Sequence, residues 1–195
     1  MPTQVRSVCH QTGNGTSFRS ATTAGFTLLE LLVTVAILAI LATLATPSFT
    51  SLINSNRLTA QANEVVASLQ LARTEAIKQN RRTIICRSTN GTSCAAAGQW
   101  TQWITYVDIN SSGTPQAAEI VRVNRVKAPL RVTSGVASIT FRADGMARTA
   151  AGALQDNAVT VCIPTTRPAE NQRIVNLATG SRISSSPANG AGACP

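Results

Sequence analysis

Histidine and acidic residues are scarce in this chain of 195 residues, and their scarcity limits its chemistry. There is one histidine, His10, and the eight acids are scattered, with no close pair in an apolar context. The Ser-His-Asp and Cys-His arrangements of hydrolases therefore lack a base anywhere beyond residue 10. No glycine-rich motif of the kind that cradles phosphates occurs. We expect a protein that is not an enzyme, with no cofactor and no small-molecule substrate.

One apolar run dominates what is present. Residues 26–46 form 21 consecutive positions with a single charge, Glu30, and no proline or glycine before Pro47. As a helix this run would rise about 31 Å, which matches the hydrocarbon core of a bilayer. A carboxylate at that depth costs a few kcal/mol, so it is usually paired or functional. A secretory signal cut after Ala45 is the alternative, but the run is long for that purpose and Glu30 would have no role in it.

The stretch from Gly25 to Phe49, GFTLLELLVTVAILAILATLATPSF, resembles the N-terminal signature of type IV pilins and type II secretion pseudopilins. In that family a prepilin peptidase cuts after the glycine, which implies cleavage after Gly25 and N-methylation of Phe26. The resemblance also implies that Glu30 pairs with the N-terminal amine of a neighbouring subunit. A filament thereby supplies the partner that a buried carboxylate and a buried ammonium each require.

Residues 1–25 are predicted to be a leader that is cleaved. They carry Arg6 and Arg19 and no acid, and basic residues before an apolar run keep the N-terminus on the cytoplasmic side. Residues 26–46 would then span the inner membrane once, with the C-terminal domain in the periplasm and, by the resemblance, at the extracellular pilus tip after assembly. Removing the leader leaves fifteen basic residues against eight acids, a balance of +7.

Helical periodicity continues beyond the apolar run. In residues 47–80 apolar residues recur at spacings of three and four while polar residues take the other faces, which predicts an amphipathic continuation of the same helix. We expect it to end near Asn80, before the β-branched residues that begin at Thr83. The apolar stripe that would face a core comprises Phe49, Leu52, Ile53, Leu58, Ala62, Val65, Leu69, Ala72 and Ala76.

Residues 81–195 have the pattern of a β-domain. Segments rich in β-branched residues, several of them alternating with period two, are separated by turn signals and by no helix, which predicts antiparallel meanders. The clearest hairpin is at Asp144-Gly145. The expected fold class is α+β and pilin-like, with a long N-terminal helix packed on an antiparallel β-sheet or β-sandwich domain. The expected strands are residues 83–86, 103–107, 119–123, 137–142, 158–163 and 173–177, and the Ser/Ala/Gly/Pro-rich tail from 184 to 195 is expected to be flexible unless it is tied down.

Four cysteines follow Gly25, and in an exported domain they allow three pairings. We favour Cys86–Cys94 across the Asn90-Gly91 turn, and Cys162–Cys194, because Cys194 ends a tail with nothing apolar to pack against. The closed loops of 9 and 33 residues would contribute roughly 2.6 and 3.7 kcal/mol in the chain-entropy model. A zinc site formed by these cysteines is the alternative. The sequence contains no Cys-x-x-Cys motif and no histidine beyond residue 10, so we expect no metal.

The span from Asn56 to Asn80, with Cys86-Arg87-Ser88 and Gly98-Gln99-Trp100 after it, resembles the FimT/FimU/GspH branch of the family. Members of this branch are minor pilins or minor pseudopilins that are thought to prime filament assembly and cap the tip. The resemblance implies other minor pilins, major pilins and the prepilin peptidase as partners. It leaves open whether the chain is a FimU-like subunit of a type IV pilus or a GspH-like subunit of type II secretion.

DNA binding is a further alternative, because some FimT members take up DNA through a Gly-Arg-x-Arg motif. In the matching Gly180-Ser181-Arg182-Ile183, serine and isoleucine stand where the two arginines should be, which weighs against it. Strand alternation would place Arg122 and Asn124 on one face and Val121 and Val123 on the other. A basic stripe there would give salt-sensitive, non-specific affinity for DNA. Alternatively, its arginines would only coat the solvent face, or would pair with acidic patches on neighbouring pilins. The candidate DNA contacts are Arg122, Arg125, Lys127, Arg131 and Arg182, and Arg81, Arg82 and Arg87 also cluster in sequence.

Overall fold

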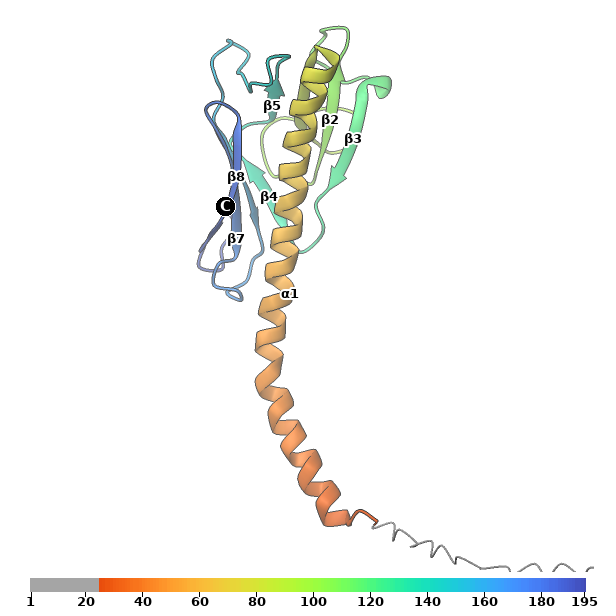
Figure 1. The fold of residues 1–195 in the computed structure, drawn as a ribbon, viewed down its shortest axis with the longest axis vertical. Helices are drawn as coiled ribbons and strands as arrows, with labels where there is room; N and C mark the ends of the chain where they lie inside the picture. The colour runs from red at the N-terminus through yellow and green to blue at the C-terminus, as the bar shows by residue number, and fades with distance from the viewer. Residues whose placement is uncertain (1–24) are drawn as a thin grey trace, which may run out of the picture. The chain divides into compact units, whose positions relative to one another are not determined.

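The computed structural model of the protein describes residues 25–195, without the side chains of residues 44–47. The predicted leader therefore lies outside the described residues, apart from Gly25. The chain divides into two compact units, one that ends at Ala42 and one that runs from Thr43 to Pro195. A single helix, α1 (Leu28–Gln79), contributes to both units (Figure 1).

α1 is 52 residues long and joins the apolar run to its amphipathic continuation in one helix. Its backbone is helical through Pro47, and its N-terminal part is long and apolar enough to cross a membrane. The helix ends at Gln79, next to the expected position. Asn80 adopts a left-handed φ of 51°, and the Arg81 N–H donates to the Ala76 carbonyl at 3.2 Å, which closes the last turn.

The buried face of α1 in the second unit follows the predicted stripe only from Leu58 onward. Phe49, Leu52 and Ile53 are between 49% and 62% exposed, so the expectation that they face the core is wrong for this chain by itself. The β-domain reaches α1 only from about Asn54, whose side-chain amide donates to the Arg167 carbonyl at 2.9 Å. The stripe residues that are at most 4% exposed are Leu58, Ala62, Val65, Leu69, Ala72 and Ala76.

The β-domain consists of two four-stranded antiparallel sheets, here called sheet A and sheet B. Sheet A has the order β3-β2-β1-β5, and sheet B has the order β4-β6-β7-β8. In Figure 1, β2 and β3 lie on one side of α1, and β7 and β8 lie on the other. The predicted α+β, pilin-like fold is confirmed. The strands are β1 (Arg82–Ser88), β2 (Gln102–Asp108), β3 (Ile120–Arg125), β4 (Arg131–Ser134), β5 (Ser138–Phe141), β6 (Asn157–Cys162), β7 (Gln172–Ala178) and β8 (Arg182–Ala188), with a short 3₁₀ helix, η1 (Ala117–Glu119), before β3.

Two of these strands, β4 and β8, were not expected from the sequence. β4 has four residues, too few for a clear alternation. β8 contains Ser184-Ser185-Ser186-Pro187, a composition that is typical of loops. It is a strand because it pairs along its whole length with β7, and because proline is tolerated at the edge of a sheet. The expected hairpin at Asp144-Gly145 does form, with Gly145 at a φ of +73° and the Gly145 N–H bonded to the Arg142 carbonyl at 2.8 Å.

One apolar core joins α1 to both sheets. Trp100 and Trp103 are each 1% exposed, and their rings lie 6.3 Å apart within this core. The backbone N–H of Trp100, two residues before β2, donates to the Val132 carbonyl on β4, which links the segment before β2 to the edge of sheet B. A second, smaller cluster lies on the face of sheet A that points away from α1. It consists of Ile84, Cys86, Ile104 and Tyr106, with Ile120 packed against it.

Candidate functional site

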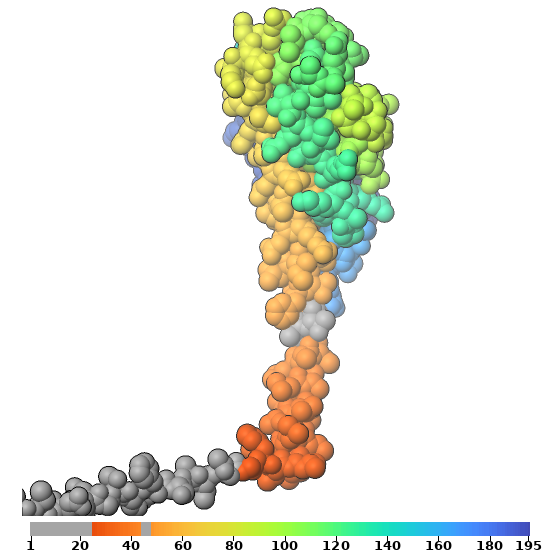
Figure 2. Space-filling model, turned by 90° about the vertical axis from the view of Figure 1, so that its right-hand side faces the viewer, coloured from red at the N-terminus to blue at the C-terminus, as the bar shows by residue number. Residues whose placement is uncertain are grey.

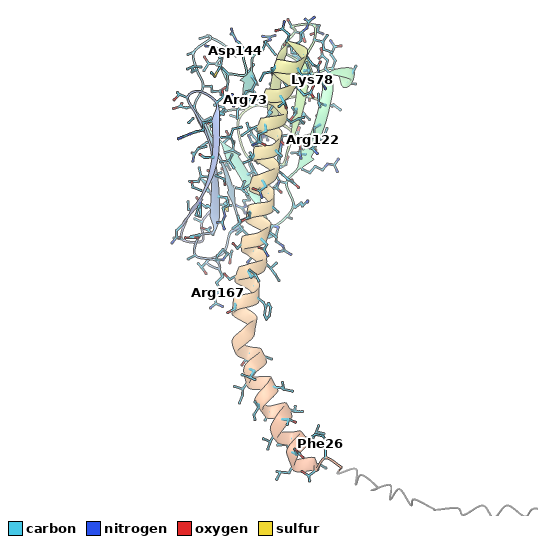
Figure 3. All side chains as sticks on the ribbon, viewed as in Figure 1. Phe26, Arg73, Lys78, Arg122, Asp144 and Arg167 are labelled. Atoms are coloured by element: carbon cyan, nitrogen blue, oxygen red, sulfur yellow. A yellow bond between two sulfur atoms is a disulfide. The ribbon has the colours of Figure 1, made fainter. Side chains whose placement is uncertain are left out.

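The N-terminal part of α1 is apolar on every side (Figure 3). The large apolar side chains from Leu28 to Leu41 are all between 46% and 82% exposed, and Phe26 before them is 80% exposed. A helix that is apolar all round is stable only where other apolar groups surround it, in a protein core or a membrane. This segment is therefore built to be covered by lipid or by other helices.

Glu30 stands in the first turn of this helix, three residues after Thr27. The Glu30 N–H donates to the Thr27 Oγ1 at 3.2 Å, so Thr27 caps the helix. The spacing Thr-x-x-Glu is that of a capping box, and a carboxylate in the first turn is favoured by the helix dipole. The proposed cleavage site, Gly25, is exposed, and apart from its chain neighbours no described residue has an atom within 4 Å of where its Cβ would lie. The structure thus places Gly25, Phe26 and Glu30 together at one exposed end.

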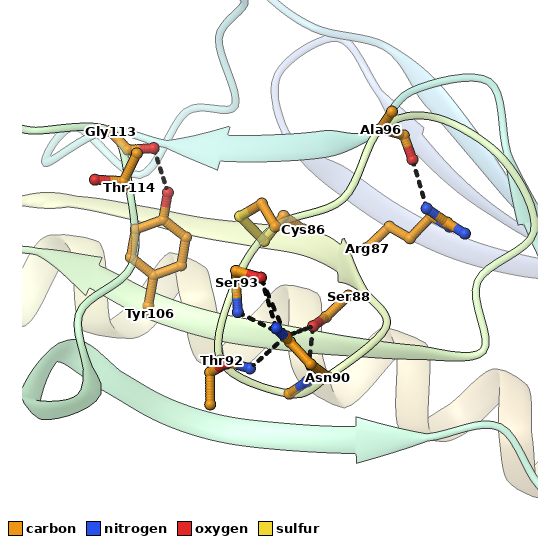
Figure 4. Close-up of a disulfide and its surroundings, with 12 residues drawn as sticks. Cys86, Arg87, Ser88, Asn90, Thr92, Ser93, Ala96, Tyr106, Gly113 and Thr114 are labelled. Carbon is orange, nitrogen blue, oxygen red and sulfur yellow. Dashed lines mark hydrogen bonds between the residues drawn. A yellow bond between two sulfur atoms is a disulfide. The ribbon is translucent and has the colours of Figure 1, made fainter.

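A disulfide joins Cys86 on β1 to Cys94 in the loop that follows, with 5.5 Å between the Cα atoms. Within this loop the Asn90 Oδ1 accepts the N–H groups of Thr92 and Ser93 at 2.9 Å, and the Gly91 N–H donates to the Ser88 Oγ at 2.9 Å (Figure 4). Cys86 also belongs to the small apolar cluster on the outer face of sheet A. The loop is therefore held against that face by covalent and polar contacts together.

A second disulfide joins Cys162, at the end of β6, to Cys194 in the tail. Asn171 lies beside it and is fully buried. Its side-chain amide donates to the carbonyls of Ile163 and Ala193, both at 3.0 Å, and its Oδ1 accepts the Gly190 N–H at 2.8 Å. The end of the chain is thus tied at several points. The periodicity of the sequence did not single out Asn171, although an Asn between two strands is a common turn organiser.

Three arginines that cluster in the sequence contact loops of the β-domain. Arg82 forms an ion pair with Asp108, whose side chain is fully buried. The Arg81 guanidinium donates to the Ile109 carbonyl at 2.9 Å. The Arg87 guanidinium donates to the carbonyls of residues 99 and 96 at 2.7 and 2.9 Å. These three side chains hold loops in place, so they do not form a free basic patch.

The five candidate DNA contacts are exposed but do not form one continuous stripe. Arg122 and Arg125 lie on β3 at the edge of sheet A, whereas Arg131 lies on β4 and Arg182 on β8, at opposite edges of sheet B. The Lys127 Nζ is 3.3 Å from the Glu64 Oε1 on α1 and forms an ion pair with it. The structure therefore puts Arg122 and Arg125 on the same edge strand but on opposite faces of sheet A, and it leaves Arg182 apart from both.

Ser181 occupies the position at which the DNA-uptake motif would have an arginine. It is 1% exposed and has a positive φ of 59°. Its carbonyl accepts a hydrogen bond from the Arg73 guanidinium at 3.1 Å, and its Oγ accepts the Ala147 N–H at 2.7 Å. Ser181 thus ties the turn before β8 to α1 and to the hairpin after β5. The side chain here points into the fold and is not available to a nucleic acid.

Polar contacts between α1 and sheet A were not foreseen from the sequence. The Trp103 indole N–H donates to the Ser68 Oγ at 3.0 Å, and the Ser68 hydroxyl lies 3.3 Å from the Asn124 Oδ1 on β3. Nearer the start of α1, the Gln61 Oε1 accepts the Lys127 N–H at 3.2 Å. Ser68 and Gln61 are polar residues beside the apolar stripe of the helix. Their presence there is the only feature of the sequence that could have indicated these hydrogen bonds.

Two buried acids organise the segment between β2 and β3. The Glu119 carboxylate accepts the N–H groups of Ile109 and Gln116 at 3.0 and 3.1 Å, and the Asp108 carboxylate accepts the Gly113 N–H at 3.1 Å. Tyr106 lies next to them, and burial, with the Asp108 charge second, raises the pKa of its phenol to about 12. Among residues 25–195 no group of three or more metal-ligating side chains is placed to hold an ion. The acids of this region therefore shape a loop.

Two family models match the sequence. The model for GspH, a type II transport protein, matches residues 61–180, which is more than half of the chain. The model for the prokaryotic N-terminal methylation motif matches residues 21–46, which include Gly25, Phe26 and Glu30. No curated protein matches the sequence.

Solved structures share the arrangement of a long helix and a β-domain. One crystal form of the type IV minor pilin FimU of Pseudomonas aeruginosa matches with a TM-score of 0.50 and 24% identity, over 68% of this chain and 90% of FimU. A second crystal form matches with a TM-score of 0.48 and 23% identity, over 67% and 93% of the two chains. The minor pseudopilin EpsH of the type 2 secretion system of Vibrio cholerae matches with a TM-score of 0.49 and 10% identity, over 67% and 97%. At these identities the likeness concerns the fold.

Proposed function

The chain belongs to the GspH family of minor pilins and pseudopilins, and on that premise we propose that it primes the assembly of a type IV pilus and sits at the pilus tip. Before assembly residues 26–46 would hold it in the inner membrane, with the β-domain in the periplasm. Prepilin peptidase would remove the leader after Gly25 and methylate Phe26. Membership of the family also implies that its partners are other pilins.

The observation that carries this proposal is the exposed apolar helix with one carboxylate at its start. Its large apolar side chains from Leu28 to Leu41 are at least 46% exposed on every side, so the segment needs a surrounding that the described part of the chain does not supply. Lipid supplies it before assembly, and the helices of other subunits supply it afterwards. The Glu30 carboxylate, costly in either setting, is then matched by the charged amine of a neighbouring subunit.

A strain that lacks the gene tests the proposal. We expect few or no surface filaments with a normal pool of major subunit, because priming fails while synthesis continues. The deletion strain is then complemented with the chain that carries an epitope after Pro195. Immunogold labelling should find this epitope at one end only of the restored filaments. An unchanged number of filaments in the deletion strain, or label along the whole filament, would contradict the proposal.

A minor pseudopilin of type II secretion is the second candidate. The description of the matching family as a type II transport protein favours it. In the same deletion strain this candidate predicts that secreted enzymes accumulate in the periplasm while surface filaments remain. Filament counts and secreted activity, measured on the same cultures, therefore separate the two candidates.

DNA uptake is the third candidate, and the exposure of Arg122 and Arg125 on one strand favours it. It predicts that the full mature chain in detergent retards duplex DNA at low salt and loses this effect as salt rises. Substituting both arginines with glutamine should then abolish retardation. The buried Ser181 removes the motif that other members use, and absence of any salt-sensitive shift would exclude this candidate.

A further inference from the structure

β3 forms one edge of sheet A, and its outer side pairs with no segment of residues 25–195. It pairs with β2 on its inner side only, from the Gln102–Arg125 pair to the Tyr106–Ile120 pair. Figure 2 looks onto this edge, where the green atoms of β3 and of the connection after it run down the middle of the face beside α1. An open strand edge is a template for pairing with another chain.

The other three sheet edges are less suited to pairing with another chain, for different reasons. On β5 the Thr140 carbonyl accepts the Arg148 N–H at 2.9 Å, and on β4 the Val132 carbonyl accepts the Trp100 N–H at 2.8 Å. β8 is open, but it presents serines and Pro187, which lacks an N–H. β3 instead presents Val121 and Val123, which are 44% and 43% exposed. It is the one sheet edge in the described chain that combines free pairing groups with exposed apolar side chains.

The backbone of β3 is oriented to accept a further strand. The Val126 N–H donates to the Thr101 carbonyl at 2.9 Å, so in this antiparallel register Asn124, two residues earlier, also faces β2. The residues that alternate with them, Arg125 and Val123, therefore direct their N–H and C=O groups to the open side. These groups would form the hydrogen bonds of an added strand without loss of any bond to β2.

The side chains of β3 indicate the chemistry of such a strand. Arg122 and Asn124 lie on the face toward α1, as the Asn124 contact with Ser68 shows. Val123 lies on the opposite face, where its Cγ1 is 3.4 Å from the Cβ position of Gly91. A register shift beside Val121 interrupts the alternation there. An apolar residue opposite Val123, with acids within reach of Arg122 and Arg125, would complement this edge.

We propose that the open edge of β3 receives a strand from a different pilin-like subunit, one that places acids opposite Arg122 and Arg125 and an apolar residue opposite Val123. This inference rests on the proposed function in a multi-subunit assembly. A second copy of this chain fits poorly, because β3 contains two arginines and no acid, so pairing β3 with β3 would gather four like charges on two neighbouring strands. Among the described strands only β2 contains an acid, Asp108, and that acid is paired with Arg82.

Site-specific cross-linking in the native host, with all other subunits present, tests this proposal. A photoreactive benzoylphenylalanine replaces Val121 in the full chain, and a matched control replaces Ser185 on the β8 edge. Both membrane and sheared-filament fractions are irradiated, and the cross-linked peptides are sequenced. We expect position 121, and not position 185, to capture a segment of another subunit in which two acids lie three residues apart with an apolar residue next to one of them.

Two pairs of variants in the cross-linking chain identify the cause of the capture. Arg122→Glu should lower the yield by about tenfold or more, whereas Arg122→Lys should keep it, because opposed like charges disfavour strand pairing. Val123→Pro should lower the cross-linking yield by a similar factor, because the substitution removes an outward backbone N–H. Val123→Thr should keep the yield, because threonine has that N–H and the same β-branched shape. Circular dichroism of each variant verifies that the β-domain is folded.

Several results would overturn the inference: equal capture at position 185, capture of a second copy of this chain, or capture that neither Arg122→Glu nor Val123→Pro reduces. Cross-linking to DNA at position 121 would assign the edge to nucleic acid and overturn it as well. The presence of the chain in sheared filaments is scored separately. A chain that enters filaments without a β3 cross-link in either fraction refutes only this inference, and one that is absent from filaments refutes the proposed function.

Discussion

The indole N–H of Trp103 on β2 and the hydroxyl of Ser68 on α1 form a buried hydrogen bond of 3.0 Å between the helix and sheet A. Ser68 is fully buried and Trp103 is 1% exposed. The Ser68 hydroxyl also donates to the Glu64 carbonyl at 2.8 Å, so both groups are satisfied inside an otherwise apolar layer. Because the bond has a fixed direction, it sets how α1 lies on the sheet, which apolar contacts alone do not.

Ser68→Ala should destabilise the β-domain. It leaves the Trp103 N–H buried without a partner, which costs about 1–3 kcal/mol, and each kcal/mol corresponds to roughly 2–4 °C in Tm for a chain of this size. The measurement is thermal unfolding of the full chain in detergent by circular dichroism. Thr74→Ala is the matched control, because the Thr74 hydroxyl is exposed and bonds only within its own helix. Equal Tm values for the two variants would show that the bond contributes nothing.

Glu30→Gln should leave membrane insertion intact and reduce recruitment into filaments. The substitution removes the charge but keeps the N–H that donates to Thr27, so the helix cap remains. Without the carboxylate, the amine of the neighbouring subunit lacks its partner. Immunoblots of membrane and sheared-filament fractions measure both effects. Glu170→Gln, at an exposed position of the β-domain, should behave as wild type, and normal recruitment of Glu30→Gln would argue against the pairing role.

Gly25→Val should block removal of the leader. We expect prepilin peptidase to require glycine at this position, so a β-branched residue there should prevent cleavage. Apart from its chain neighbours, no described residue has an atom within 4 Å of where a Cβ of residue 25 would lie. We expect the variant to accumulate in the membrane at the mass of the uncut chain. Intact-mass measurement of the membrane-extracted protein gives the answer, and a mature product that begins at Phe26 would refute the proposed cleavage site.

Reduction should open two disulfides in the purified chain, seen as a rise in intact mass by the hydrogens of two bridges. Cys194→Ser should lower the free energy of unfolding by up to about 3.7 kcal/mol and Cys94→Ser by up to about 2.6 kcal/mol, because the loop closed by Cys162–Cys194 is longer. Denaturant unfolding compares the two variants. Free thiols at all four cysteines in the untreated protein would contradict both pairings, and free thiols at two of them would contradict one.

Tyr106 should titrate far above the range of an exposed tyrosine. Burial raises its pKa to about 12, whereas the unfolded chain loses this proton at a pH of about 10. Between these values the folded state holds more protons than the unfolded state, so stability should fall as pH rises through this window, and Tyr106 should contribute no pH dependence below it. It is the only tyrosine, so phenolate absorbance after rapid pH jumps reports it alone.

Tyr106→Phe is the control for this titration. It should remove the absorbance change and the contribution of this group to the loss of stability at high pH. It also removes the hydrogen bond from the phenol to the Gly113 carbonyl at 2.9 Å, so a small loss of stability at neutral pH is expected as well. A midpoint near pH ~10 while circular dichroism still shows folded protein would contradict the burial of this ring.

Much of the fold follows from local patterns in the sequence. The stripe from Leu58 to Ala76 predicted the buried face of α1 because a helix repeats every 3.6 residues. Each expected strand overlaps an observed one, because alternation over several residues matches the two faces of a strand. β8 was missed because Ser184-Ser185-Ser186-Pro187 has no such alternation, and its pairing with β7 depends on tertiary contacts. Phe49, Leu52 and Ile53 continue the same periodicity yet lie outside the β-domain, because periodicity does not tell what will cover a face.

The candidate sites likewise include some that can be recognised from the sequence and some that only the tertiary structure defines. The N-terminal signature with Gly25, Phe26 and Glu30 can be recognised from residue types in a fixed order, because its chemistry depends on sequence neighbours. The tertiary structure decided what the arginines do. Arg82 and Arg87 hold loops, Ser181 is buried where a DNA contact was considered, and Arg122 and Arg125 lie on an open strand edge. These roles depend on which distant segments meet, and such meetings are set by packing of the whole chain rather than by any local run of residues.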